Sequence, residues 1–397
     1  MTYIARSLPK RGERVRRTVL LLVASMVTAL LVASGAALAA TLSGVADADT
    51  VQTNGRVVAI LVRGDTVYLG GYFTRVDGVT RNHLAAIDAT TGKLTGWNPN
   101  ANGSVRSLAL SADGSRILAG GAFGRVGGLG RQRLAAINAS TGAVDPTWKP
   151  QANDTVYALA TSGQSVYVGG KFATVNGQSR AHLALVDATT GTLAPNWAPS
   201  ADGEVRALGL SSDGTRLYAG GEFTTLNGTS RPYLAALSPT TGALSGTWSR
   251  PTRPNGRVFD LEASGGKVYT AEGGAGGAAA AYDATTGVRA WIARGEGDAQ
   301  GVAVVGSEVY VGGHFKTLSG QSRQQLAALN ATTGALDPQW NPKASLGDNC
   351  TTWQPNICGS GVWALTADPS AGRLYAGGDF REVSGDRHAG FARFSKQ

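Results

Sequence analysis

The chain has 397 residues, 56 of them glycine, and carries 36 lysine and arginine side chains against 27 aspartate and glutamate side chains. Six of the basic residues and one of the acidic residues lie in residues 1–39, so residues 40–397 carry 30 basic and 26 acidic side chains, scattered along the sequence. Such a small excess is not the footprint of a nucleic-acid-binding protein, and we expect no nucleic-acid partner.

The N-terminal segment is predicted to be a secretory signal peptide. Six basic residues precede an uncharged apolar run at 19–32, and the Ala-Leu-Ala sequence at 37–39 is typical of a cleavage site. A second Ala-x-Ala sequence at 46–48 leaves two positions for cleavage. The uncharged stretch extends to residue 40, so the alternative is an uncleaved helix at 1–39 that anchors the protein in a membrane. We therefore expect a secreted, extracellular protein or, in the alternative, a cell-surface protein anchored by this helix.

Residues 55–397 contain seven copies of one repeat, spaced by roughly 50 residues. Three anchors define the copies: a Gly-Gly-x-Phe sequence, a Thr-Gly turn after Leu-Ala-x-x-Asp/Asn-Ala, and a closing Trp. The first anchor ends at Phe73, Phe123, Phe172, Phe223, Phe315 and Phe380. The closing tryptophans are Trp97, Trp148, Trp197, Trp248, Trp291 and Trp340. The fifth copy replaces the first anchor by residues 272–277, and the seventh copy ends before a closing Trp.

Each copy predicts four short β-strands. The first three read Val-x-Ala-Leu-Ala, Leu-Tyr-Ala-Gly-Gly-x-Phe and Leu-Ala-Ala-Ile-Asp, and the fourth ends at Trp-x-Pro, with Asp-Gly or Ser-Gly at tight turns. A repeat of this size cannot bury its apolar faces alone and must pack against its neighbours. The sequence therefore predicts an all-β fold, a seven-bladed β-propeller of four-stranded antiparallel blades over 55–397, preceded by the N-terminal signal or anchor helix. A solenoid is the alternative, but it needs polar capping repeats that the sequence lacks.

The two ends of the repeat region are predicted to meet in one blade. The seventh copy lacks its fourth strand, because residues 391–397 correspond to strand three. Residues 48–51, within the segment 40–54 that precedes the first copy, lie in the register of a fourth strand. We expect this segment to complete the seventh blade and to tie the ends of the propeller together.

Two cysteines, Cys350 and Cys358, lie in the one large insertion, at residues 345–361. In a secreted protein they are expected to form a disulfide that closes this loop. Two thiols without a nearby His make an incomplete metal shell, so no metal site is expected.

The anchors Gly-Gly-x-Phe, Leu-Ala-Ala-x-Asp-Ala-Thr-Thr-Gly and Trp-x-Pro, at this spacing, resemble those of the delta-60 repeat propellers. That family occurs in secreted bacterial proteins. The resemblance covers almost all of the chain after the leader and implies the propeller architecture, but it says almost nothing about activity.

A second resemblance links residues 86–93 and the following Trp97 to the tryptophan-docking motif of quinoprotein propellers. In that family the Trp usually follows the Gly by four positions, whereas Trp97 follows Gly92 by five. The adjacent cysteine pair of the quinone-binding dehydrogenases is missing. We interpret the motif as a Trp that packs between neighbouring blades, and we expect no cofactor.

One position of the repeat is predicted to form a binding site. The loops between strands two and three are longer than those of the opposite face, so the face that carries them is the candidate binding face. The residue after the first Val of strand one, the innermost strand, varies most and would ring the mouth of the central channel on that face. These residues are Val58, Arg106, Tyr157, Arg206, Phe259, Gln300 and Trp363. Aromatic, guanidinium and amide groups suit a sugar, an acidic polysaccharide or a peptide. In the alternative, the same side chains pack between blades or plug the channel.

The third residue of Gly-Gly-x-Phe also varies, which indicates a secondary rim outside this ring. Its polar and aromatic members are Tyr72, Lys171, Glu222, His314 and Asp379. Solvated surface is the simpler interpretation of their mixed charge.

An arginine recurs just before strand three in six copies, which favours a structural role. These residues, expected to donate to loop carbonyls, are Arg81, Arg131, Arg180, Arg231, Arg323 and Arg387.

No catalytic residue is predicted, because the four histidines fall in separate repeats and no linear catalytic motif occurs. We expect a monomeric, secreted, non-catalytic binding module that recognises a glycan, a cell-envelope component or a protein partner. The alternative is a secreted hydrolase or lyase that acts on a polysaccharide, which would need two acids or a histidine cluster to converge at the channel mouth. The first acids to inspect are Asp260 and Glu262, which are unusual on strand one.

Overall fold

The structure of the protein is a computed structural model that describes residues 42–248, 254–346 and 361–396. The regular secondary structure of these residues consists of β-strands, which confirms the predicted all-β class. No helix in the three described ranges is long and apolar enough to cross a membrane. The predicted signal peptide or anchor and the predicted disulfide lie outside the described residues.

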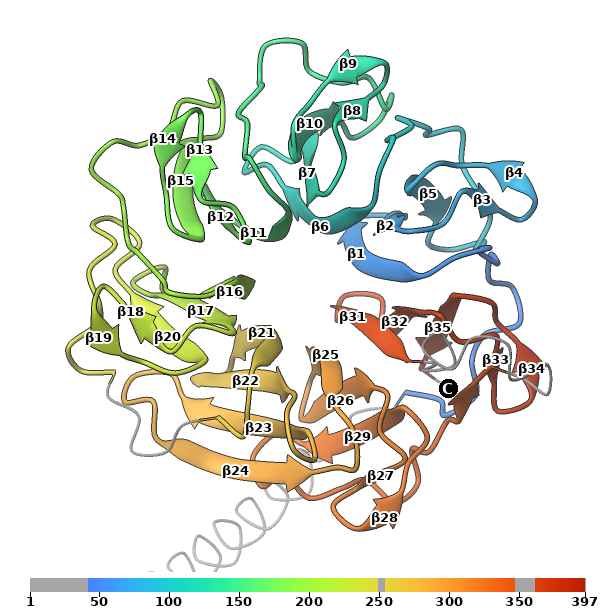
Figure 1. Cartoon of the computed structure of the whole chain (residues 1–397). Helices are drawn as coiled ribbons and strands as arrows, with labels where there is room; N and C mark the ends of the chain where they lie inside the picture. Colours follow the sequence, from blue (N-terminus) through green and yellow to red (C-terminus); the bar gives the residue numbers. More distant parts are fainter. Residues whose placement is uncertain (1–41, 249–253, 347–360, 397) are drawn as a thin grey trace, which may run out of the picture. The chain divides into compact units, whose positions relative to one another are not determined.

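Seven larger antiparallel sheets follow one another in the described residues (Figure 1). The first sheet consists of β1 (Val57–Arg63), β2 (Thr66–Gly71) and β5 (Leu84–Asp88). The second consists of β6 (Val105–Leu110), β7 (Arg116–Gly121) and β10 (Leu134–Asn138). The third consists of β11 (Val156–Ser162), β12 (Ser165–Gly170) and β15 (Leu183–Asp187). The next two are β16 (Val205–Leu210), β17 (Leu217–Gly221) and β20 (Leu234–Leu237); and β21 (Val258–Ser264), β22 (Lys267–Glu272), β23 (Ala278–Asp283) and β24 (Arg289–Arg294). The last two are β25 (Ala299–Val305), β26 (Glu308–Gly313) and β29 (Leu326–Asn330); and β31 (Val362–Asp368), β32 (Arg373–Gly378) and β35 (Phe391–Ser395).

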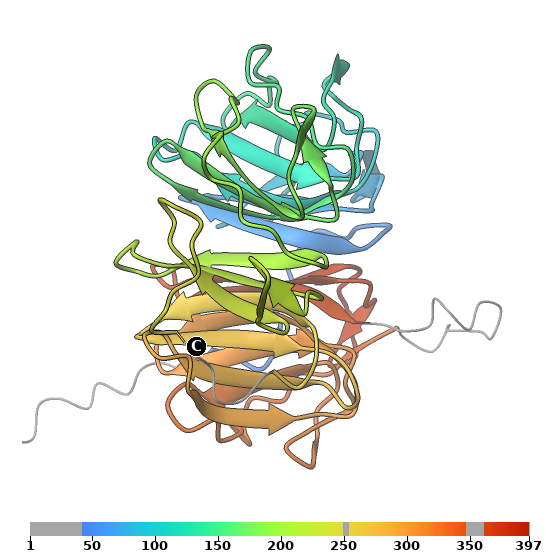
Figure 2. The same ribbon diagram turned by 60° about the vertical axis from the view of Figure 1, so that its left-hand side comes forward.

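The first strands of these sheets form a closed ring. Strands β1, β6, β11, β16, β21, β25 and β31 contact one another in this order, and β31 in turn contacts β1. Figure 2 follows the same sheets around the ring from a second direction. An open stack would leave its terminal repeats without neighbours, whereas here the last sheet packs against the first. The fold of residues 42–396 is a β-propeller, and a solenoid is excluded.

The apolar core lies between neighbouring sheets. One cluster packs Tyr68 of the first sheet against Val105 and Ile117 of the second sheet. Another joins Val57 of the first sheet to Tyr375 of the seventh sheet. Burial of apolar surface thus occurs at the interfaces between repeats, which is why a single copy could not fold by itself.

The closing tryptophans fasten each sheet to the next. The indole N–H of Trp97, at the end of the first repeat, donates to the carbonyl oxygen of Asn138 in the second sheet at 3.0 Å. Trp148 donates in the same way to Asp187 of the third sheet, also at 3.0 Å. The equivalent bonds join Trp248 to Asp283, Trp291 to Ala331, and Trp340 to Ser43. The prediction that the tryptophans pack between neighbouring blades is confirmed.

A complete fourth strand occurs only in the fifth sheet of the described residues, as β24. In the other repeats that carry a closing Trp, the corresponding segment makes a single bridge to strand three, for example Leu94 to Ile87. Two residues after each bridge stands a glycine or proline, namely Gly96, Pro146, Pro195, Gly246 and Pro338. Both residue types weaken a strand, and proline cannot donate to a ladder. Four full strands, predicted for every blade, are therefore seen in one sheet, where no Gly or Pro follows Arg289 before the Trp.

The segments between strands two and three fold into small hairpins rather than open loops. In the first sheet, β3 (Arg75–Val76) and β4 (Val79–Thr80) pair across Asp77 and Gly78, which both have positive φ. That combination is typical of a type I′ turn. The equivalent hairpins are β8 (Arg125–Val126) with β9 (Leu129–Gly130), β13 (Thr174–Val175) with β14 (Gln178–Ser179), β18 (Thr225–Leu226) with β19 (Thr229–Ser230), β27 (Thr317–Leu318) with β28 (Gln321–Ser322), and β33 (Glu382–Val383) with β34 (Asp386–Arg387). A further short strand, β30 (Ala344–Ser345), pairs with β33.

The N-terminal segment is hydrogen-bonded to the last strand. The backbone N–H of Ser43 donates to the carbonyl oxygen of Ser395 at 2.9 Å, and that of Asp47 donates to Arg393 at 2.7 Å. The side chain of Asp47 forms an ion pair with Arg393. These contacts lie at residues 42–47, whereas the sequence suggested residues 48–51 for this pairing.

The tryptophan hydrogen bonds can be tested by comparing two buried tryptophans. Trp148 and Trp197 are both fully buried, but Trp197 Nε1 has no acceptor among the described residues. We expect Trp148→Phe to lower the free energy of unfolding by about 1 kcal/mol more than Trp197→Phe, because only the former removes a hydrogen bond. Urea denaturation of the two variants measures this difference. Equal losses would show that ring packing alone fastens the sheets.

Candidate functional site

Each first strand carries a β-bulge near its beginning, where one extra residue is inserted against strand two. The extra residues are Val58, Arg106, Tyr157, Arg206, Phe259, Gln300 and Trp363. A bulge redirects a side chain out of the regular alternation of the strand. These are the same seven residues that the sequence places in a ring, so the fold gives all of them one common local geometry.

The second glycine of Gly-Gly-x-Phe makes this bulge possible. A Cβ atom on Gly71 would collide with the carbonyl oxygen of Arg56, two residues before the bulge at Val58. The same collision would occur at Gly121, Gly170, Gly221, Gly313 and Gly378. A glycine is therefore needed wherever strand two approaches the bulged strand this closely.

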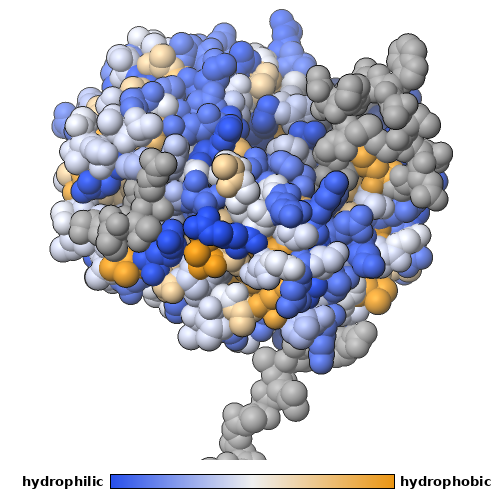
Figure 3. Space-filling view, turned by 60° about the horizontal axis from the view of Figure 1, so that its bottom comes forward, coloured by the Kyte–Doolittle hydropathy of each residue, from blue (hydrophilic) through white to orange (hydrophobic). Residues whose placement is uncertain are grey.

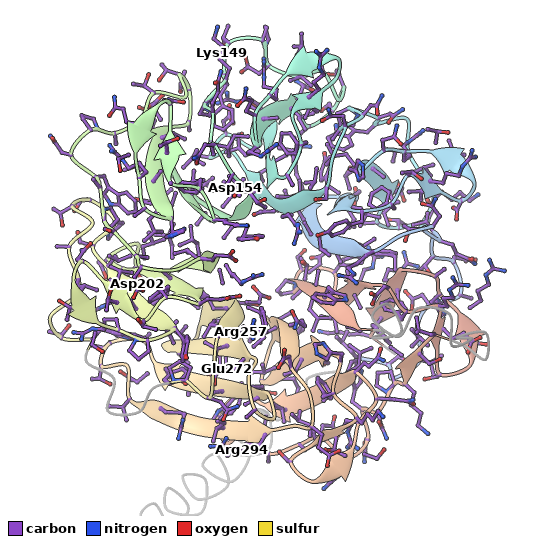
Figure 4. The ribbon with its side chains drawn as sticks, in the orientation of Figure 1. Lys149, Asp154, Asp202, Arg257, Glu272 and Arg294 are labelled. Atoms are coloured by element: carbon purple, nitrogen blue, oxygen red, sulfur yellow. The ribbon has the colours of Figure 1, made fainter. Side chains whose placement is uncertain are left out.

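In the fifth sheet, Glu272 takes the place of the second glycine and lies opposite Val258. The Glu272 side chain is fully buried and accepts hydrogen bonds from Thr270 Oγ1 and Tyr282 Oη, both at 2.8 Å. Burial raises the pKa of Glu272. Its place within the fifth sheet is labelled in Figure 4. The carboxylate therefore helps hold together a sheet that has no hairpin between its second and third strands.

The seven bulge residues line one depression, together with Arg56 and Tyr72. Its volume is about 100 Å³. We call this depression the channel mouth. Small-molecule sites usually measure about 300–1,000 Å³, so the channel mouth has room for the end of a side chain rather than for a whole ligand of that kind.

Arginine and aromatic side chains alternate around the channel mouth. The guanidinium carbon of Arg56 lies 4.1 Å from the centre of the Trp363 ring and 5.8 Å from that of Tyr72. The guanidinium carbon of Arg106 lies 4.8 Å from the Tyr72 ring and 5.4 Å from the Tyr157 ring. These distances are typical of cation–π contacts.

The alternation continues across the fourth and fifth sheets. The guanidinium carbon of Arg206 lies 4.7 Å from the Tyr157 ring and 5.7 Å from the Phe259 ring, and that of Arg257 lies 5.7 Å from Phe259. Because cations cover these aromatic faces, a sugar that stacked on them would have to displace an arginine. The guanidinium N–H groups, which lie in the plane of each cation, are the donors that remain for a ligand.

Carboxylates neutralise three of the four arginines. Asp379 pairs with Arg56 at 2.6 Å and also accepts a hydrogen bond from Trp363 Nε1 at 3.0 Å. Glu222 pairs with Arg206 at 2.8 Å and with Arg257 at 3.5 Å. Arg106 is the exception, since its side chain has no ion pair or hydrogen bond with any described residue.

The secondary rim lies beside this ring and bonds to it. Tyr72 lines the channel mouth itself and is 38% exposed, and Glu222 and Asp379 pair with arginines that line it. The ring of His314 lies 6.1 Å from that of Trp363, and its Nε2 lies 3.8 Å from Asp298. Lys171 lies 3.8 Å from Asp154, which Figure 4 shows near the central opening. Tyr72, Glu222, His314 and Asp379 thus contact residues of the ring, whereas Lys171 is a largely exposed side chain that pairs with Asp154.

A larger cavity of about 1,010 Å³ adjoins the channel mouth between the first and last sheets. It shares Arg56 and Tyr72 with the channel mouth, and Asp379, Arg381 and Glu382 also line it. On the face drawn in Figure 3, polar side chains predominate and apolar side chains form small separate spots.

Asp260 and Glu262 lie deeper on β21 and do not line the channel mouth. Asp260 accepts hydrogen bonds from the backbone N–H groups of Leu261 and Val302, and Glu262 accepts one from Val304 at 3.0 Å. Burial raises the pKa of Asp260 to about 6 and that of Glu262 to about 7. Both carboxylates therefore join the fifth sheet to the edge of β25 in the sixth.

The arginines that precede strand three have the structural role that the sequence predicts. Arg81 Nη2 donates to the carbonyl oxygen of Thr95 at 2.9 Å, and Arg131 Nη2 donates to Asp145 at 2.6 Å. Arg180 and Arg323 make the equivalent bonds. The prediction that these side chains donate to loop carbonyls is confirmed for these four residues.

Sequence reasoning missed the residues two positions before the bulge. Arg56, Arg257, Glu204 and Asp298 occupy this column, and they contribute two cations and two acids to the network. The same comparison of repeats could have found them, because this column also varies between copies. In an extended strand, residues two apart point to the same side, which places this column beside the bulge residues, and Arg56 lines the channel mouth itself.

The fold and this site define a β-propeller repeat domain whose charged side chains gather around one end of the channel. Residues 196–347, less than half of the chain, match the model of a family described as outer membrane protein assembly factor BamB. The match supports the resemblance to quinoprotein-type propeller repeats. A comparison with curated proteins gave no match. Among the described residues, no three His, Cys, Asp or Glu side chains are grouped so that they could hold a metal ion.

The raised pKa values of Asp260 and Glu262 make stability depend on pH. Their ordinary values are 3.8 and 4.5, so the folded protein holds these protons more tightly than the unfolded chain. Stability is therefore lost as the pH rises from about 4 to about 7. We expect the free energy of unfolding of the double variant Asp260→Asn/Glu262→Gln, relative to that of the wild type, to increase by about 1–3 kcal/mol as the pH rises from 4.5 to 8.

Thermal unfolding of both proteins across this pH range measures the gain. Asparagine and glutamine keep an oxygen that can accept from Val302 and Val304, so the hydrogen bonds are retained. A constant difference in Tm between the two proteins at all pH values would contradict the assignment of the titration to these carboxyls.

Proposed function

We propose that the chain is a secreted, non-catalytic binding module of the delta-60 repeat type, and that a protein partner docks on its channel mouth. The observation that carries this proposal is the convergence of seven bulged residues, one from each sheet, on a single depression. The scaffold residues of the repeat stay constant while these seven vary. Binding residues held on a rigid repeat scaffold show this pattern.

The size and lining of the channel mouth favour a protein partner over a glycan or another envelope component. A volume of about 100 Å³ accepts one side chain, and the aromatic faces that would stack on sugar rings are in contact with arginines. A protein can dock on the surrounding rim and insert a single side chain. The match to a family described as an assembly factor also supports a role in binding other proteins.

The polysaccharide hydrolase or lyase has less support. It requires two carboxylates, or a histidine cluster, that are available at the channel mouth. Asp379, Glu204 and Glu222 are the acids nearest to it along the chain of contacts, but none of them lines it and each is bound to an arginine that does. Their arrangement supports orientation of the arginines rather than acid–base chemistry.

The remaining parts of the proposal concern the segments outside the described residues. The leader would direct the chain out of the cytoplasm, and the insertion would be closed by a disulfide between Cys350 and Cys358. The mature protein would act as a monomer, with the surface-anchored form as the alternative if the leader is retained.

Photo-crosslinking tests the proposed function directly. The full chain is produced in its own cells with p-benzoylphenylalanine in place of Tyr157, and adducts are identified by mass spectrometry. We expect one protein to be crosslinked from position 157 and not from a matched control at Val288, which is 47% exposed and does not line the channel mouth. Crosslinks of equal yield from both positions, or none from position 157, would overturn the proposal.

Once that partner is identified, Tyr157→Ala should weaken its binding by about tenfold, because Tyr157 contacts two arginines of the site. The free energy of unfolding should change by less than about 0.5 kcal/mol, since the residue is only half-buried. Calorimetric titration and thermal unfolding measure the two effects. A marked loss of stability would instead assign Tyr157 to the core.

A further inference from the structure

The second and fourth repeats provide an internal comparison at the channel mouth. Both place an arginine at the bulge, Arg106 in the second sheet and Arg206 in the fourth. Both arginines lie against Tyr157, at 5.4 Å and 4.7 Å from its ring centre. The two side chains therefore have similar surroundings on their aromatic sides.

The two repeats differ in their acids. Arg206 pairs with Glu204 at 2.7 Å and with Glu222 at 2.8 Å. At the equivalent positions of the second repeat stand Ser104 and Ala122. Within the described residues, Arg106 consequently has no carboxylate partner, although the fourth sheet shows where such a partner fits.

From this difference we infer that Arg106 binds a carboxylate of the partner protein, which occupies the place that Glu222 takes in the fourth sheet. The inference rests on the proposed function and names the chemistry of the inserted group, an Asp or Glu side chain. Tyr72 and Tyr157 lie on either side of Arg106 along the ring and leave its in-plane N–H groups to pair with an acceptor.

The surroundings of Arg106 favour an acid over a neutral ligand. An arginine held among rings and other arginines, without a counter-charge, creates a positive potential that a carboxylate relieves. Arg56, Arg206 and Arg257 would not compete for the ligand, because each already has an acid. The volume of about 100 Å³ suits a single acidic side chain.

Two reciprocal variants test the inference, with a capped hexaglutamate peptide as the probe. Ala122→Glu supplies an internal acid to Arg106 and should weaken peptide binding at least tenfold. Ala122→Gln is the matched control without charge and should change binding less than threefold. Glu222→Ala leaves Arg206 with fewer acids and should strengthen peptide binding. Calorimetric titration at low and high salt measures each affinity, and circular dichroism verifies folding.

The outcomes separate this inference from the proposed function. If Ala122→Glu and Ala122→Gln bind the peptide equally well, the assignment of Arg106 is wrong, while a crosslink from position 157 would still support a binding module. If an oligogalacturonate binds and the peptide does not, the inference that Arg106 binds a protein carboxylate is wrong, and an acidic glycan is the ligand. Arg106→Gln provides a further test of the same residue. If this variant binds the peptide with full affinity, the inference is also wrong.

Discussion

The packing of each closing tryptophan against the next sheet is the contact on which the ring depends, and five of the six indoles also donate a hydrogen bond there. A single repeat exposes an apolar face on either side, and the indole both covers part of that face and donates to a backbone carbonyl of the neighbour. The last of these tryptophans, Trp340, finds its acceptor at Ser43, in the segment that pairs with the final strand. The N-terminal segment therefore completes a set of contacts that the seventh repeat cannot complete itself, and it does so where the ends of the ring meet.

The same architecture also produces the site. The second glycine of Gly-Gly-x-Phe lets the first strand bulge toward its neighbour, and the bulge turns one side chain per sheet toward the end of the channel. Because the bulge is a backbone feature, it leaves the identity of that side chain free. A rigid frame thus carries a variable set of groups, and the charged residues two positions earlier fix their orientation through ion pairs and cation–π contacts.

The arrangement of charge at the channel mouth is the main support for the proposed protein partner. Arginines lie against the aromatic faces, acids hold three of the arginines, and the remaining cation, Arg106, has the geometry of Arg206 without its acids. Partial neutralisation keeps the mouth from attracting anions indiscriminately. In the proposed complex, the guanidinium without an acid would select the ligand, since a ligand gains most where it supplies a missing partner.

The periodic pattern alone predicts the repeat, the all-β class, the propeller and seven equivalent ring residues, because equivalent residues take equivalent places in every sheet. That these residues stand at β-bulges became visible only in the structure. The pattern also predicted the docking of Trp97 and its equivalents. The prediction of a full fourth strand is wrong in the repeats where a residue such as Gly96 or Pro146 interrupts the ladder. The three-dimensional structure was needed to show which side chains meet across two sheets: Arg56 reaches Trp363, and Arg206 has acids where Arg106 has none. Contacts of this kind depend on side-chain reach across an interface that exists only once the ring has closed.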